Sequence, residues 1–78
     1  MRRLAEIAVE VRRDWRPINN GAAVSAIDAM ATMGLVTEPY GLDPNGYGVI
    51  GQFLSNAAGW RGPVARRVKA ELRAMCTR

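Results

Sequence analysis

Histidine is absent from this chain of 78 residues, and cysteine occurs once, at Cys76. An intrachain disulfide is therefore impossible, and a standard zinc site, which needs several Cys or His ligands, is excluded. The usual pairs of a nucleophile and a histidine base are missing too. Paired carboxylates could still act as acid and base, but no spacing brings two of Asp28, Glu38 and Asp43 together. We therefore expect a binding protein that is not an enzyme and needs no cofactor.

Long apolar runs are also scarce. Residues 21–36 come closest to a membrane segment, but they are rich in alanine and carry Asp28 at their centre, whereas a span needs about 20 apolar residues. Near the start of the chain, Glu6 and Glu10 interrupt what would be the apolar part of a secretory signal. A single cysteine fits a reducing compartment. The sequence thus predicts an intracellular protein that does not enter a membrane.

Lysine and arginine are missing from residues 17–60, although the chain has a net charge of +4. The formal charge is +2 over residues 1–16, −3 over residues 17–60 and +5 over residues 61–78. If the two basic ends meet in the folded chain, they form a positive face that favours anionic partners. Two separate, solvated helix faces that keep the protein soluble would give the same pattern.

Apolar residues recur at helical spacing in four stretches, and the sequence predicts a helix over each: residues 3–15, 20–33, 44–58 and 63–76. Asn19 or Asn20 can cap the second helix, and Asp43-Pro44 suits the start of the third. Three glycines between residues 46 and 51 disfavour that start, so the third helix could instead begin near Val49. The expected fold class is all-α, a single domain of residues 1–78 in which four helices form a compact bundle with a longer loop between helices two and three.

The second predicted helix is rich in alanine and carries Asp28 as its only charge. A helix that is apolar on most sides is normally buried, so we expect it at the centre of the bundle or in a self-association surface. Asp28 should be exposed or paired with an arginine, for which Arg61 is a candidate. Trp15 and Trp60 each lie at a predicted helix end, where we expect them to be core anchors that seal the bundle.

Residues 50–73 have the pattern of a helix-turn-helix motif, with Gly59 to Gly62 as the turn. Few side chains at the start of the last helix could read bases, and any two-helix corner with a basic second helix has this pattern. A continuous positive face that joins the last helix to Arg12, Arg13 and Arg16 would favour DNA binding. A large apolar patch on the second helix would favour a protein partner. The candidate partner- or anion-binding residues are Arg61, Arg66, Arg67, Lys69 and Arg73.

The start of the last helix has no capping side chain, because Gly62 lacks one, and Pro63 also lacks an N–H group. Free N–H groups at a helix start attract anions, and several arginines are close in sequence. An anion pocket is one interpretation. The other, which we favour, is that an acidic side chain of residues 17–60 occupies this helix start. The candidates are Asp28, Glu38 and Asp43.

A family resemblance is carried by Ile7 to Trp15, by Asp28-Ala29-Met30 and by the string from residue 54 to residue 72. Its most specific part is residues 53–62, with Phe-Leu-Ser-Asn-Ala followed by Trp-Arg-Gly. Over nearly its whole length the chain resembles a family of small proteins, with no assigned activity, encoded by actinobacteriophages of the mycobacteriophage type and their prophages. Residues 19–21 and the extra glycines of the middle depart from that pattern. The resemblance implies the cytoplasm of an infected actinobacterium and carries no residue roles with it.

The resemblance and the composition together favour a small non-enzymatic phage accessory protein that binds a host or phage protein. The alternative is a helix-turn-helix-like DNA-binding regulator that uses residues 50–73. A homodimer is a further open alternative, because a small domain without disulfides or metals is commonly supported by a partner chain.

Overall fold

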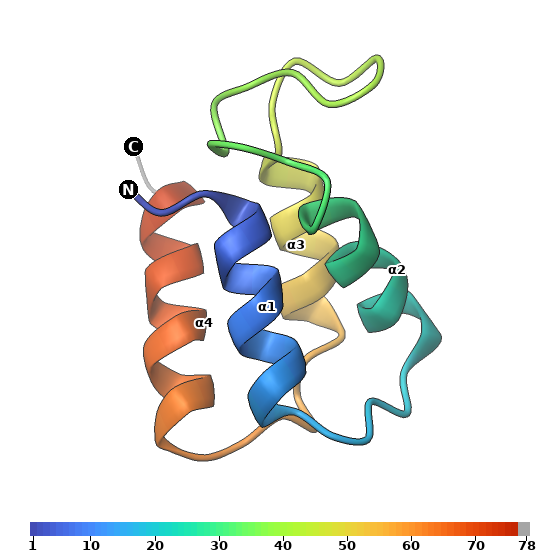
Figure 1. Cartoon of the computed structure of the whole chain (residues 1–78), viewed down its shortest axis with the longest axis vertical. Coiled ribbons are helices and arrows are strands. Elements are labelled where there is room, and N and C mark those ends of the chain that lie inside the picture. Colours follow the sequence, from blue (N-terminus) through green and yellow to red (C-terminus); the bar gives the residue numbers. More distant parts are fainter. Residues whose placement is uncertain (77–78) are drawn as a thin grey trace.

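The protein is described here by a computed structural model, which describes residues 1–76. Within these residues the fold is all-α, as predicted (Figure 1). The only β-type pairing in this range is an isolated bridge between Tyr40 and Asp43. None of the helices in this range has the length and hydropathy of a membrane span. The helices are α1 (Leu4–Asp14), α2 (Gly21–Met30), α3 (Tyr47–Ser55) and α4 (Pro63–Cys76).

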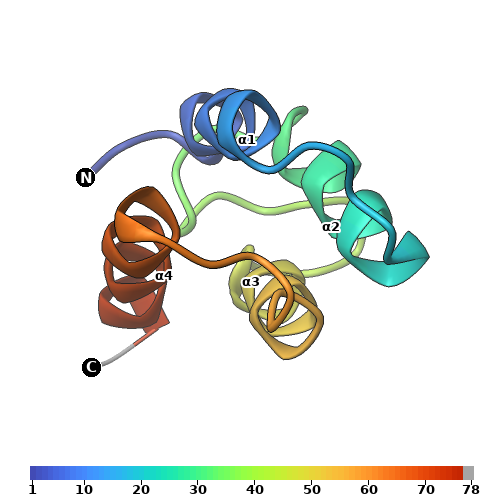
Figure 2. The ribbon, with the colours of Figure 1, turned by 90° about the horizontal axis from the view of Figure 1, so that it is seen from below.

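The four helices form the walls of a bundle around a shared apolar interior (Figure 2). Helix α1 packs against α2 and α4, and α3 packs against the same two helices, so the diagonal pairs do not pack against each other. The expectation that the Ala-rich helix lies at the centre is therefore wrong. Helix α2 is one wall, which buries Ala23, Ala26, Ile27 and Met30 and leaves its other side exposed.

The start of α2 follows the sequence, whereas its end does not. The Asn20 side chain accepts a hydrogen bond from the backbone N–H of Ala23 at 3.0 Å, which caps the helix as predicted. The helix ends at Met30, before the predicted Met33. Residues 31 and 32 form a turn, and the N–H of Met33 donates to the carbonyl of Met30 at 3.0 Å. This turn places Met33 and, after it, Val36 in the core.

Helix α3 begins at Tyr47, between the two predicted starts. The N–H of Gly46 donates to the carbonyl of Val36 at 2.7 Å, which ties the helix start to the far end of the preceding loop. A Cβ at Gly46 would lie 2.6 Å from Cε of Met33 and 3.1 Å from Cδ1 of Leu4, so a larger residue here would force the end of the Met33 side chain to shift. The N–H of Tyr47 donates to Oδ1 of Asn45 at 3.0 Å.

An aromatic cluster closes the end of the bundle where α1 ends and α4 begins. Trp15 and Trp60 stack with ring centroids 5.9 Å apart, and Phe53 meets both rings edge to face at 6.3 and 6.1 Å. Trp60 is buried, and its Nε1 donates to Oδ2 of Asp14 at 2.8 Å. Both tryptophans are thus core anchors, as predicted from their positions at helix ends.

Candidate functional site

The five candidate cations do not form one surface, because α4 is flanked by α1 on one side and by α3 on the other. We call the residues that face α1, Arg67 and Glu71, the paired flank. We call Arg61 together with Arg66, Lys69 and Arg73 of α4 the cationic flank. Three of the latter recur at spacings of three and four, which places them on one face of the helix.

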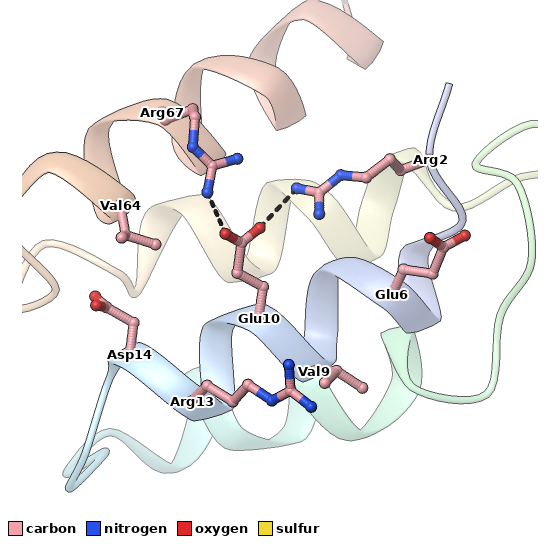
Figure 3. A pocket seen from close by; sticks show the side chains of 8 residues that line it. All are labelled: Arg2, Glu6, Val9, Glu10, Arg13, Asp14, Val64 and Arg67. Carbon is pink, nitrogen blue, oxygen red and sulfur yellow. Dashed lines mark hydrogen bonds and ion pairs between the residues drawn. The ribbon is translucent and has the colours of Figure 1, made fainter.

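The paired flank is joined to α1 by an ion-pair network. Glu10 lies between two guanidinium groups: Arg67 donates to its Oε2, and Nη2 of Arg2 lies 2.9 Å from its Oε1 (Figure 3). Arg2 also pairs with Glu71, with Nη2 2.5 Å from Oε1 and Nε 2.9 Å from Oε2. Arg67, one of the five candidates, is therefore a structural residue that ties α4 to α1.

The electrostatics of this network agree with its geometry. The hydrogen bond from Arg67, and after it that from Arg2, lowers the pKa of Glu10 below its ordinary value. The hydrogen bond from Arg2 lowers the pKa of Glu71. The same contacts, led by that with Glu71, raise the pKa of Arg2. All of these groups are charged at neutral pH and hold one another in place.

A groove of about 610 Å³ runs between α1 and the first half of α4 (Figure 3). Six of its eight lining residues are charged, with three of each sign, and Val9 and Val64 complete the wall. The two basic chain ends do meet here, but carboxylates neutralise them, so no positive face results. The charged residues are Arg2, Arg13, Arg67, Glu6, Glu10 and Asp14.

The remaining arginines of α1 do not extend the cationic flank. Arg12 pairs with Asp28 of α2, on the side of the molecule away from α4. Asp28 is thus both paired and exposed, but its partner is Arg12, and the candidate Arg61 was wrong. The continuous positive face that would favour DNA reading by α4 together with α1 is not formed.

The start of α4 has an acidic neighbour, but not one from residues 17–60. Asp14, the last residue of α1, lies beside Val64 at this helix start (Figure 3). Its carboxylate also accepts the hydrogen bond from Trp60. A negative charge at this position complements the positive end of the helix dipole. The three acids expected here are elsewhere: Asp28 pairs with Arg12, Glu38 accepts from the N–H of Leu35, and Asp43 lies in a distant turn.

On the cationic flank, Lys69 is held in a fixed position. Its Nζ donates to the carbonyl of Trp60 at 2.6 Å and lies 6.0 Å from the centroid of the Trp60 ring. Burial lowers the pKa of Lys69, and the positive charges of Arg73 and Arg61 lower it further. Arg61 and Arg73 therefore each act on the ammonium group of Lys69, and no acidic group contributes to the shift.

Residues 50–73 do not have helix-turn-helix geometry. Helix α3 ends at Ser55, so the connection covers residues 56–62 and is longer than a turn of 3–4 residues. The chain leaves the helix at Asn56, which places Ala57 and Trp60 in the core. Helices α3 and α4 then run in opposite directions side by side (Figures 1 and 2). The pair is an antiparallel hairpin, and α4 is not a separated recognition helix.

The sequence did not single out the most exposed apolar side chain of the molecule. Leu42 is exposed at 105 % of its reference area and lies in the turn closed by the bridge between Tyr40 and Asp43. This turn belongs to a loop between α2 and α3 that projects beyond the bundle (Figure 1). We call residues 37–45 the projecting loop. Helix α2, by contrast, contributes no large exposed apolar residue; the other two in the described part of the chain are Met1 and Val9. Large side chains therefore form no apolar patch on α2, the feature that would have favoured a protein partner, and the exposed leucine lies in the loop after it.

The projecting loop is braced along its length. At its base, the N–H of Gly46 binds the carbonyl of Val36, which is fully buried. At its tip, the backbone groups of Tyr40 and Asp43 exchange two hydrogen bonds of 2.9 Å. Pro39 and Pro44 restrict the backbone on either side of this turn. A leucine between two prolines in a tight turn is the sequence signal that could have identified this feature.

No group of three or more Asp, Glu or Cys side chains within residues 1–76 is placed to hold a metal ion. Comparison of the chain with known protein families, with curated proteins and with solved structures finds no match. The candidate sites therefore rest on the geometry above: the projecting loop and the cationic flank.

Proposed function

We propose that this is a non-catalytic accessory protein of an actinobacteriophage or its prophage, which binds a host or phage protein in the bacterial cytoplasm. The projecting loop is its docking element, and Leu42 is the anchor. The observation that carries the proposal is the complete exposure of Leu42 at the tip of a braced turn. The phage origin and the cytoplasmic setting come from the resemblance of residues 7–15 and 53–62.

Packing within the fold does not explain why a leucine lies at position 42. It is fully exposed, so its side chain adds no burial to the core. Burial of a leucine side chain in a partner would contribute about 1.5–3 kcal/mol. Because the loop is already held by hydrogen bonds at its base and tip, little conformational freedom would be lost on binding. A preformed apolar projection of this kind suits a small pocket on a protein surface.

The charges of the loop indicate which charges the rim of the partner's pocket would carry. Asp43 lies at the tip and Glu38 at the base, and the loop contains no basic residue. Oxygen Oε2 of Glu38 accepts the N–H of Leu35 at 2.8 Å, which holds the base of the loop. The fitting partner is therefore a protein with an apolar pocket that has basic residues at its edge.

Capture of partners from an actinobacterial host lysate tests this proposal. Immobilised wild-type protein is compared with Leu42→Asp and with the control Val9→Asp, which makes the same charge change at another exposed apolar residue. We expect a protein that is retained by wild type and by Val9→Asp and is lost with Leu42→Asp. A photo-crosslinking amino acid at position 42 should then form a covalent adduct with that protein.

The proposal fails if wild type and Leu42→Asp retain the same proteins in the same amounts. It also fails if the crosslinker at position 42 forms no adduct while one placed at position 9 does. Circular dichroism of both variants ensures that a loss of capture reflects the loop and not unfolding.

A further inference from the structure

We propose that the cationic flank, formed by Arg61, Arg66, Lys69 and Arg73, binds the phosphate backbone of nucleic acid without reading its sequence. This goes beyond the protein-binding function and uses a different surface.

The chain distributes its acids unevenly around α4. Glu10 and Glu71 are both engaged with Arg2 or Arg67 on the paired flank. No acidic side chain of residues 1–76 forms an ion pair with Arg61 or Arg66, and both arginines are exposed. Like charges at helical spacing destabilise a helix. An anion that binds to this cluster would offset the repulsion between its cations.

The cations are positioned rather than scattered. The hydrogen bond from Lys69 to the carbonyl of Trp60 fixes the centre of the flank, and Arg61 and Arg73 act on that ammonium group. Arg66 and Arg73 are seven residues apart, or about 10 Å along the helix axis. Duplex DNA carries about six phosphates over that length on its two strands. The flank can thus contact several phosphates at once.

The same surface lacks the groups that would read bases. Trp60, the aromatic residue beside Lys69, is 2 % exposed and therefore cannot stack on a base. The turn that begins α4 presents Pro63, Val64 and Ala65, none of which carries a hydrogen-bonding side chain. Because α3 and α4 form an antiparallel hairpin, α4 is not displayed for insertion into a groove. The contact is therefore with phosphates and not with base edges.

Fluorescence anisotropy with a labelled random-sequence duplex, over a series of salt concentrations, tests this inference. Four phosphate contacts predict a slope of about −3.6 for log K against log salt. Arg61→Glu combined with Arg66→Glu should weaken binding at least tenfold and make the slope shallower. Arg13→Glu combined with Arg16→Glu makes the same charge change outside the cationic flank, and should weaken binding no more than about threefold.

Two results would overturn the inference. The first is no binding by wild type even at low salt, which would make the cationic flank a solvated or acidic-protein surface. The second is an equal loss in both double variants, which would show that net charge alone attracts DNA. Leu42→Asp should bind the duplex as wild type does, so failure here and failure of loop docking are separate outcomes. Circular dichroism checks that each variant folds.

Discussion

The two flanks of α4 both carry arginine but contribute differently to the structure. On the paired flank, Arg67 and Glu71 join a network with α1 that links residues far apart in the chain. On the cationic flank, Lys69 is held by a backbone carbonyl and repelled by its neighbours Arg61 and Arg73. The difference shows that a basic helix is not a binding site as a whole. Cations that the fold has paired stabilise it, and those it leaves clustered are available to a ligand.

The largest expected effect is on the paired flank. Glu10→Gln keeps the side-chain volume but removes the charge between Arg2 and Arg67, and should lower the free energy of unfolding by about 1–2 kcal/mol. Urea unfolding followed by circular dichroism measures this. The control is Asp28→Asn at the exposed pair with Arg12, where we expect a loss below about 0.5 kcal/mol. Equal losses in the two variants would remove the distinction between the paired flank and an ordinary surface ion pair.

The pH dependence of stability also tests the contribution of the ion pairs on the paired flank. The pKa values of Glu10 and Glu71 are lowered in the folded protein, whereas an unfolded Glu has a pKa of about 4.3. Their contribution is therefore complete above about pH 5 and is lost as the pH falls through the folded pKa values. Between about pH 5 and 3, Glu10→Gln should lose stability less steeply than wild type. Parallel pH profiles for the two proteins would contradict this.

A smaller effect is expected on the cationic flank, in the titration of Lys69. The charge of Arg61 is one of the causes that lower the pKa of this lysine. Arg61→Gln should therefore raise that pKa toward its ordinary value, which NMR of the Lys69 side chain can follow. Arg13→Gln on α1 is the control and should leave it unchanged. If the pKa does not move with Arg61→Gln, the two cations are not close neighbours in solution.

The smallest expected effect on stability is at the projecting loop. Leu42→Asp should change the free energy of unfolding by less than about 0.5 kcal/mol, because the side chain contacts solvent only. Thermal unfolding next to wild type measures this. Leu42, like the cations of the cationic flank, is a group that we propose binds a partner. A loss of several kcal/mol would mean that Leu42 packs in the folded protein and is not an exposed anchor.

Much of the fold could be predicted from the sequence, because apolar spacing fixes which side of each helix is buried. The stripe Leu4, Ile7, Ala8 and Val11 is fully buried. Helix ends were predicted less well where tertiary contacts decide them. The end of α2 depends on the burial of Met33, and the start of α3 on a hydrogen bond from Gly46 to Val36. Neither contact is visible in local sequence.

The sequence identified which residues of α4 are candidate cations, but not which of them are paired with acids in the fold. The cations of α4 could be found by spacing alone, but the partner of Arg67 is Glu10, on another helix, and that of Arg2 is Glu71, near the opposite end of the chain. Pairings over such separations follow from how the helices pack. Leu42 was missed because a leucine is ordinarily expected in the core. Its place between Pro39 and Pro44 was the one local sign of an exposed turn.

The most direct test of the account is to measure stability and duplex affinity together in two variants, one on each flank of α4. Glu10→Gln should lower the free energy of unfolding and leave the dissociation constant for random duplex DNA within about twofold of wild type. Arg61→Glu with Arg66→Glu should leave the free energy of unfolding nearly unchanged and weaken duplex binding at least tenfold. If both variants change the free energy of unfolding and the dissociation constant in parallel, the two flanks do not differ in role. The proposed distinction between the paired flank and the cationic flank would then be wrong.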